Sequence, residues 1–183
     1  MAAWLKGRAW SAAAFVWGFA EASLFFVVPD LVLSAIGLKR GARAGAAASF
    51  WAALGAGLGG AAMYAWSACE PEAARAAVLA VPAISDEMAN AARLAIDTHG
   101  WFLATLAGPL STTPFKLYAI LAPDAGAPLA VFITASVIAR LPRFLLASLG
   151  GALLRHWFQE RALPWLAGAW VLFYAVFFAL TPN

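Results

Sequence analysis

An apolar segment in the second half of the chain, residues 101–122, is interrupted at 108–116 by the sequence G-P-L-S-T-T-P-F-K. A helix that simply spans a membrane does not need two prolines, a glycine, three hydroxyl side chains and a lysine at its centre. Proline removes a backbone donor and disfavours helical backbone at the residue before it. Non-helical backbone inside a membrane is tolerated only where it is buried in protein or faces water. The segment therefore predicts a broken helix that other parts of the protein enclose.

The overall composition places this broken segment in a membrane. Of the 183 residues, 64% are hydrophobic and only 11% are charged, and the mean hydropathy is +0.80. Soluble domains carry about 25% charged residues. The basic residues flank apolar runs instead of forming a solvated patch, which argues against nucleic-acid binding. We therefore expect a single-domain, all-α integral membrane protein.

Two other apolar runs are also interrupted by proline and charge. The run 9–38 contains V-V-P-D, and the run 127–154 contains R-L-P-R. A continuous helix over 9–38 would be about 45 Å long, whereas the hydrocarbon core of a bilayer is about 30 Å thick. Either a tilted, kinked span or a re-entrant hairpin, which turns near 27–30 and returns to its own side, fits that length. The residues predicted to break helices are Pro29, Gly108, Pro109, Pro114 and Pro142.

Three runs predict spanning helices. The run 44–68 has 25 residues and no charge, and the runs 127–154 and 162–180 are also long enough. Small residues recur every four positions in the first run: Ala52, Ala56 and Gly60, and also Gly55 and Gly59. Such spacing permits close approach of a second helix, although the high alanine content of the chain explains it equally well.

The segment 73–98 differs from these runs because it is rich in charge. Four polar side chains at helical spacing share one face of it: Asp86, Asn90, Arg93 and Asp97. Ser85 precedes them and is a favourable N-cap residue. We expect one amphipathic helix, which lies on the membrane surface or over the core.

The positions of Lys and Arg discriminate between topologies, because both favour the cytoplasmic side. Nine of the twelve lie outside the apolar segments. If 9–38 and 100–122 are both re-entrant hairpins, seven of these nine Lys and Arg residues lie on the same side of the membrane. If both segments are straight spans, six of the nine lie on the same side. If only one is a hairpin, the residues divide almost evenly between the two sides. The count favours two hairpins and a cytoplasmic N-terminus. A hairpin followed by a span then recurs in opposite orientation, the inverted repeat on which many transporters build a midplane site.

Five charged side chains fall inside the apolar segments: Glu21, Asp30, Lys116, Arg140 and Arg143. Each would cost about 2.5–3.5 kcal/mol if exposed to lipid, so we expect them to pair with one another or to face water. Three cations and two carboxylates leave one positive charge in excess, which suits an anionic phosphate head group. Arginine matches phosphate oxygens with two parallel hydrogen bonds, and Arg140 and Arg143 lie on the same side of a helix.

We assign six side chains to substrate binding, the last three as neutral donors: Arg140, Arg143, Lys116, Ser111, Thr112 and Thr113. Glu21 and Asp30 are open to two interpretations. A carboxylate in a low-dielectric medium gains affinity for a proton, so this pair either carries protons or gates transport, or it provides permanent counter-ions. Whether Lys116 binds substrate or neutralises one of the carboxylates is also open, and purely structural ion pairing by all five charges is the remaining alternative.

The other chemistry-bearing residues form no catalytic or metal-binding pattern. His99 and His156 stand at segment ends without a partner pattern, and Cys69 has no second ligand nearby in the sequence. No nucleophile constellation, nucleotide-binding loop or metalloprotease motif is present. We therefore expect a protein that is not an enzyme and that uses neither a metal nor a cofactor.

Three stretches support a family resemblance: G-F-A-E-A-S-L-F-F-V-V-P-D from residue 18, G-P-L-S-T-T-P-F-K-L-Y-A-I-L-A from residue 108 and I-A-R-L-P-R-F-L-L-A-S-L-G-G from residue 138. Together they resemble the DedA / VTT-domain (SNARE-associated Golgi protein) superfamily, in particular its short bacterial YqaA-like members. The resemblance covers residues 15–155. It implies two opposed re-entrant hairpins in a bacterial cytoplasmic (inner) membrane. It also implies translocation of undecaprenyl phosphate or phospholipid, by a flippase or scramblase.

By motif match, Glu21 and Asp30 take the place of the family's essential acidic residues, and Arg140 and Arg143 take that of its arginine pair. Asp30 stands where glutamate is usual, and Lys116 replaces an arginine of the longer members. The main hypothesis is a transporter of an anionic lipid head group, with membrane lipids as its partners. The alternatives are a small-ion or solute carrier that uses the same cavity, and a membrane assembly protein with structural charges. The oligomeric state is open, and a homo-oligomer is one option.

Overall fold

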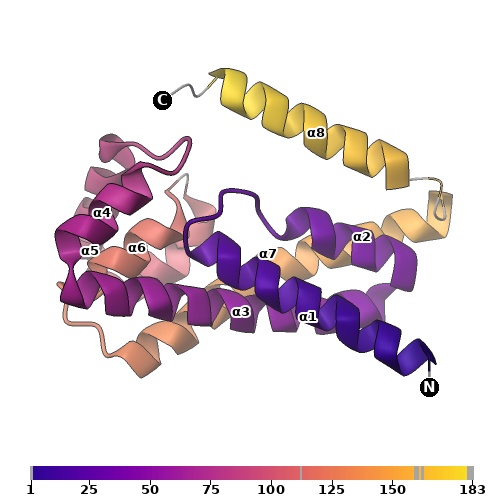
Figure 1. Ribbon diagram of the computed structural model, residues 1–183, viewed down its shortest axis with the longest axis horizontal. Helices are drawn as coiled ribbons and strands as arrows, with labels where there is room; N and C mark the ends of the chain where they lie inside the picture. The colour runs from indigo at the N-terminus through magenta and orange to yellow at the C-terminus, as the bar shows by residue number, and fades with distance from the viewer. Residues whose placement is uncertain (1, 112, 159–160, 162, 181–183) are drawn as a thin grey trace.

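The computed structural model describes residues 2–111, 113–158, 161 and 163–180, and Figure 1 shows the path of the chain. Within these residues every regular element is a helix, which confirms the predicted all-α class. The elements are α1 (Ala2–Ala22), α2 (Asp30–Arg40), α3 (Ala42–Cys69), α4 (Pro71–Leu79), α5 (Asp86–Ala107), the 3₁₀ turn η1 (Gly108–Leu110), α6 (Phe115–Leu121), α7 (Leu129–Phe158) and α8 (Leu163–Leu180).

The helix α3 is the centre of the bundle, and it contacts α1, α2, α4, α6 and α7. The chain turns back at 23–29, so that α1 and α2 run in opposite directions (Figure 1). At one end of the bundle α4, α5 and α6 gather, while α8 crosses the upper edge in this view and packs mainly on α2. Most of the described side chains of α8 are consequently exposed.

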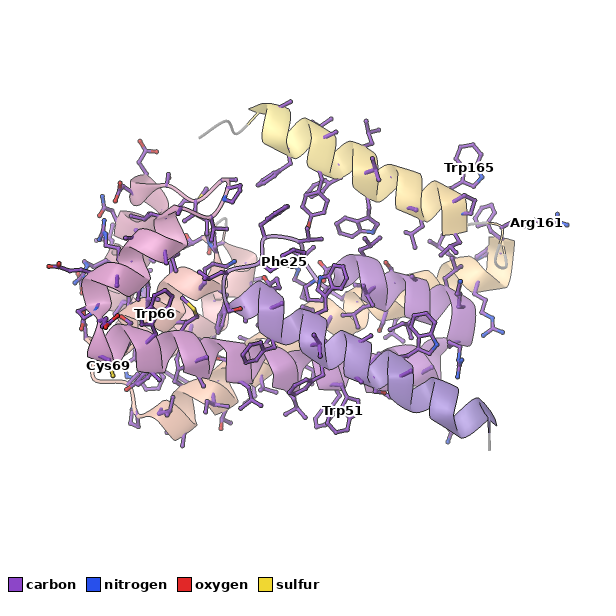
Figure 2. The ribbon with its side chains drawn as sticks, in the orientation of Figure 1. Phe25, Trp51, Trp66, Cys69, Arg161 and Trp165 are labelled. Atoms are coloured by element: carbon purple, nitrogen blue, oxygen red, sulfur yellow. The ribbon has the colours of Figure 1, made fainter. Side chains whose placement is uncertain are left out.

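Two helices, α3 and α7, are long and apolar enough to cross a membrane. The third predicted span, 162–180, corresponds to the apolar helix α8, which has 18 residues. Trp51 on α3 and Trp165 on α8 project away from the bundle, and they are 43% and 82% exposed (Figure 2). An outer surface with such large apolar side chains is compatible with a lipid surrounding.

Close packing of the helices depends on glycines. On α3, a Cβ atom added to Gly55 would lie 2.0 Å from the carbonyl oxygen of Phe15 on α1. On α7, a Cβ atom added to Gly151 would lie 2.1 Å from the carbonyl oxygen of Ser34 on α2. The small-residue spacing on α3 therefore serves packing within this chain, with α1 as the partner helix.

The prediction that Pro142 breaks its helix is wrong, because α7 runs without interruption from Leu129 to Phe158. Proline deprives one helical turn of a hydrogen bond, but helices in apolar surroundings tolerate this loss when neighbouring helices and local adjustments support the turn. Both α2 and α3 pack against α7. The two arginines that flank Pro142 consequently lie on one continuous helix.

The amphipathic helix predicted over 73–98 is in fact two helices, α4 and α5, joined by residues 80–85. Pro82 explains the interruption, since it disfavours helical backbone at Val81. Ala83 adopts a positive φ of 63°, which turns the chain between the two helices. The sequence predicted one helix because the charged residues around this connection recur at helical spacing, although the single proline interrupts the helix.

The longer of the two helices, α5, has the amphipathic character that its sequence predicts. Ser85 caps it by accepting a hydrogen bond from the Met88 amide at 3.3 Å. The exposed face carries Asp86, Asn90, Arg93 and Asp97, and the buried face carries Ala89, Ala92 and Ile96. Gly100, with a φ of 78°, kinks the helix, and its last turns lead into the second break.

Replacing Gly151 by alanine should destabilise the protein, whereas the same change at Gly150 should not. The Cβ atom at Gly151 would overlap the backbone of α2, and overpacking typically costs about 1–3 kcal/mol. Nothing lies within 4 Å of a Cβ atom at Gly150, where alanine instead gains up to about 1 kcal/mol of helix propensity. The free energy of unfolding in mixed micelles measures both effects. Equal stability of the two variants would show that α2 and α7 are not in this close contact.

Candidate functional site: a charged cavity between two helix breaks

The first helix break, residues 23–29, forms hydrogen bonds with side chains from both sides of it in the sequence. The indole N–H of Trp17 donates to the Val27 carbonyl oxygen at 2.9 Å. The Val28 amide donates to the hydroxyl oxygen of Tyr174 on α8 at 2.8 Å. Buried backbone groups outside a helix need such partners, so these side chains allow the helix to stop and resume here.

Lys116, which follows the second break, joins the two breaks. Its Nζ atom donates to the Phe25 carbonyl oxygen at 2.8 Å, and the residue is only 4% exposed. No carboxylate oxygen in the described part of the chain lies within 4.0 Å of this ammonium group. Lys116 therefore neutralises neither Glu21 nor Asp30 by direct contact.

Arg140 on α7 forms a buried ion pair with Glu21, near the end of α1. Its Nη2 atom lies 2.8 Å and 2.5 Å from the two carboxylate oxygens, and the two side chains are 6% and 11% exposed. The guanidinium also lies over the Phe115 ring, with Cζ 4.5 Å from the ring centroid, which adds a cation–π attraction. Its Nη1 atom is buried and has no hydrogen-bond partner among the described residues.

Almost one helical turn further along α7, Arg143 pairs with Asp30, the first residue of α2. Its Nε and Nη2 atoms lie 3.0 Å and 2.8 Å from the same carboxylate oxygen, Oδ2. The N-terminus of α2 also favours the negative charge of Asp30. The other oxygen, Oδ1, is buried and has no hydrogen-bond partner in the part of the chain that the structure describes. The Arg143 side chain is 44% exposed, so this cation also faces open space.

The hydroxyl groups of the second break, 108–114, are partly used by the break itself. The Ser111 hydroxyl donates to the Gly108 carbonyl oxygen at 2.8 Å and accepts from the Thr113 amide at 3.2 Å. Ser111 therefore stabilises the turn instead of offering the free donor that the sequence suggested. Ser111 and Thr113 both line the cavity described next, and Thr112 lies outside the described residues.

A cavity of about 300 Å³ lies between the two breaks, α7 and α8. Its charged lining residues are Glu21, Lys116, Arg140 and Arg143. Its aromatic wall comes from α8 and consists of Trp170, Phe173, Tyr174 and Phe177. Residues 81–84, which connect α4 to α5, contribute a further part of the lining. The fifth predicted charge, Asp30, reaches the site through its ion pair with Arg143.

Several residues of this site were not predicted from the sequence. Tyr174 and the other aromatic residues of α8 lie in the segment 162–180, for which the sequence predicts a spanning helix without site residues. Phe115 was not predicted to lie under the guanidinium of Arg140. The available signal was the i, i+3, i+4, i+7 spacing of the four aromatic residues on α8, which places them on one helix face.

The remaining candidate residues stand apart from the cavity. His99 is exposed, and Cys69 is exposed at the end of α3 (Figure 2). The side chain of His156 lies outside the described residues. Among the described residues, no group of three or more His, Cys, Asp and Glu side chains is placed to hold a metal ion.

Removing one partner of the Arg140–Glu21 pair should cost far more stability than removing both. Glu21→Leu leaves a buried guanidinium uncompensated, and breaking a buried pair in this way costs about 3–5 kcal/mol. Glu21→Leu combined with Arg140→Met replaces the pair by apolar side chains and should recover most of that loss. Unfolding free energies of the two single variants and the double variant complete the cycle. Additive losses would mean that the two side chains do not interact.

Comparisons with protein-family models, with curated proteins and with solved structures gave no match. A functional assignment therefore depends on the chemistry of the cavity itself: its two paired arginines, of which Arg143 is partly exposed, the buried lysine and the aromatic wall.

Proposed function

We propose that this protein is an integral membrane transporter that moves the anionic, phosphate-bearing head group of a lipid between leaflets. The observation that carries the proposal is the cavity of about 300 Å³, in which the partly exposed Arg143 shares one space with an aromatic wall. Arginine forms paired, charge-assisted hydrogen bonds with phosphate. The aromatic wall suits the hydrocarbon that follows the phosphate in a lipid, whereas a small inorganic anion needs only the cation.

The balance of charge supports an anionic substrate. Lys116, Arg140 and Arg143 outnumber Glu21 and Asp30, and the ammonium group of Lys116 is held by a backbone carbonyl. A bound phosphate would compensate the excess positive charge. It would also supply acceptors for donors that the described protein groups leave unused, such as the Nη1 atom of Arg140.

We further propose that 9–38 and 100–122 are re-entrant hairpins whose tips meet inside the membrane as an inverted repeat. Two observations support this: α1 and α2 run in opposite directions around the first break (Figure 1), and the hydrogen bond from Lys116 to Phe25 joins the two breaks. This is the fold that the resemblance to DedA / VTT proteins implies, together with a bacterial cytoplasmic membrane, and the count of Lys and Arg predicts a cytoplasmic N-terminus.

In the proposed cycle, the lipid phosphate and the carboxylates compete for the same arginines. Without substrate, Glu21 and Asp30 keep Arg140 and Arg143 paired, which avoids uncompensated buried charge. A phosphate that binds Arg143 releases Asp30. The released carboxylate either takes up a proton, which couples transport to a proton gradient, or stays charged and acts as a gate. Transport rates with and without an imposed pH gradient distinguish these two roles.

Arg143→Gln should slow head-group translocation by about 10- to 100-fold, because hydrogen bonds to charged groups contribute about 1.5–3 kcal/mol. Liposomes that contain the protein and a fluorescent phosphate lipid, read out by quenching of the outer leaflet, measure this rate. Arg93→Gln is the matched control, since Arg93 lies on the exposed face of α5 and does not line the cavity. A wild-type rate in Arg143→Gln would exclude Arg143 from phosphate binding.

The double variant Asp30→Asn with Arg143→Gln separates transport from a structural role. If the pair only holds α2 to α7, neutral side chains that still hydrogen-bond should preserve function. If Arg143 binds phosphate, the double variant should remain as slow as Arg143→Gln alone in the liposome assay. Recovery of the wild-type rate would instead favour a membrane assembly protein with structural charges. Ion flux that persists without a phosphate lipid would favour a small-ion or solute carrier.

A further inference from the structure

The proposed phosphate binding uses the charged residues of the cavity and gives the aromatic wall no part in holding the phosphate. We infer that this wall of α8 is a binding subsite for the hydrocarbon chain of the transported lipid, an inference that rests on the proposed function. The wall consists of Trp170, Phe173, Tyr174 and Phe177. Residues spaced in this way share one face of a helix, and that face is the one that lines the cavity.

The exposure of α8 shows that part of this wall lacks a full covering within the protein. Phe173 and Phe177 are 53% and 36% exposed although they line the cavity. Tyr174, between them, is anchored to the first break by the hydrogen bond from Val28 and by an edge-on contact with Phe26. The anchor holds α8 beside the charged groups, and the flanking rings stack on each other with their centroids 6.1 Å apart. An apolar chain along these stacked rings would bury the apolar surface that they still expose.

The charged residues and most of the aromatic residues of the cavity come from different helices, which sets the orientation of a bound amphiphile. The charged residues come from α1, α6 and α7, whereas four of the six aromatic lining residues come from α8; the other two are Phe26 in the first break and Phe115 on α6. A phosphate at Arg143 would therefore direct the first carbons of its chain toward Phe173. A volume of about 300 Å³ is at the lower end of the range for ligand pockets. The cavity thus holds the head and the start of a chain, and the rest of the chain continues outside it.

Phosphorus NMR titration of the purified protein with inorganic phosphate and with ethyl, butyl and hexyl phosphate tests this subsite. Affinity should rise about fourfold for each methylene that becomes buried. Phe173→Ala combined with Phe177→Ala should flatten this series and leave the affinity for inorganic phosphate unchanged. The matched control is Leu172→Ala combined with Val176→Ala, which changes two exposed residues of α8 that do not line the cavity. The control should retain the wild-type series.

The outcomes separate the subsite from the function on which it rests. A flat series in the wild-type protein, with inorganic phosphate bound and then lost in Arg143→Gln, would overturn the chain subsite and leave the proposed transport function in place. The subsite would also be overturned if the rise of affinity with chain length disappeared equally in the control variant with Leu172 and Val176 replaced. It would be overturned, too, if the variant with Phe173 and Phe177 replaced no longer bound inorganic phosphate. No binding of any phosphate would overturn both.

Discussion

The need to satisfy backbone hydrogen bonds in a mainly apolar protein is the constraint on which the rest of this structure depends. A helix that stops in apolar surroundings leaves N–H and C=O groups that must find partners. At the first break these partners are Trp17 on α1, Lys116 beyond the second break and Tyr174 on α8. Each of these bonds attaches another element to the break. The hydrogen bonds that satisfy the backbone of the first break therefore also hold α1, α6 and α8 around the cavity.

The two ion pairs complete this arrangement. Arg140 and Arg143 lie on one continuous helix, and they reach the two ends of the first break, where Glu21 lies near the end of α1 and Asp30 begins α2. The close contact of α2 with Gly151 of α7 supports the approach of Asp30 to Arg143. All three cations of the site are already engaged, and Arg143 is the most exposed of them, with 44% of its side chain accessible. In the proposed cycle, an anion that binds Arg143 displaces Asp30, whose charge is then either neutralised by a proton or left unpaired.

Local signals in the sequence were sufficient for the helical class and for the two long apolar helices. They also identified the five charged residues inside apolar segments, four of which are buried, because burial of a charge is costly wherever the chain places it. The pairing of Glu21 with Arg140 was not predictable, since it depends on the direction in which the chain turns at the first break. Pro142 was misjudged because the effect of a proline depends on the helices that pack around it. The contribution of α8 to the cavity lining was missed because the sequence shows an aromatic face but not which part of the fold that face contacts.

The central claim is that the cavity between the two breaks binds the phosphate of a lipid. Cryo-electron microscopy of the protein in nanodiscs that contain a phosphate-bearing lipid tests this claim most directly. We expect non-protein density for a phosphate about 2.7–2.9 Å from the guanidinium nitrogens of Arg143, with both breaks at the depth of the hydrocarbon core. Lipid phosphates confined to the two membrane surfaces, with the Arg143–Asp30 pair intact and no lipid density in the cavity, would contradict it.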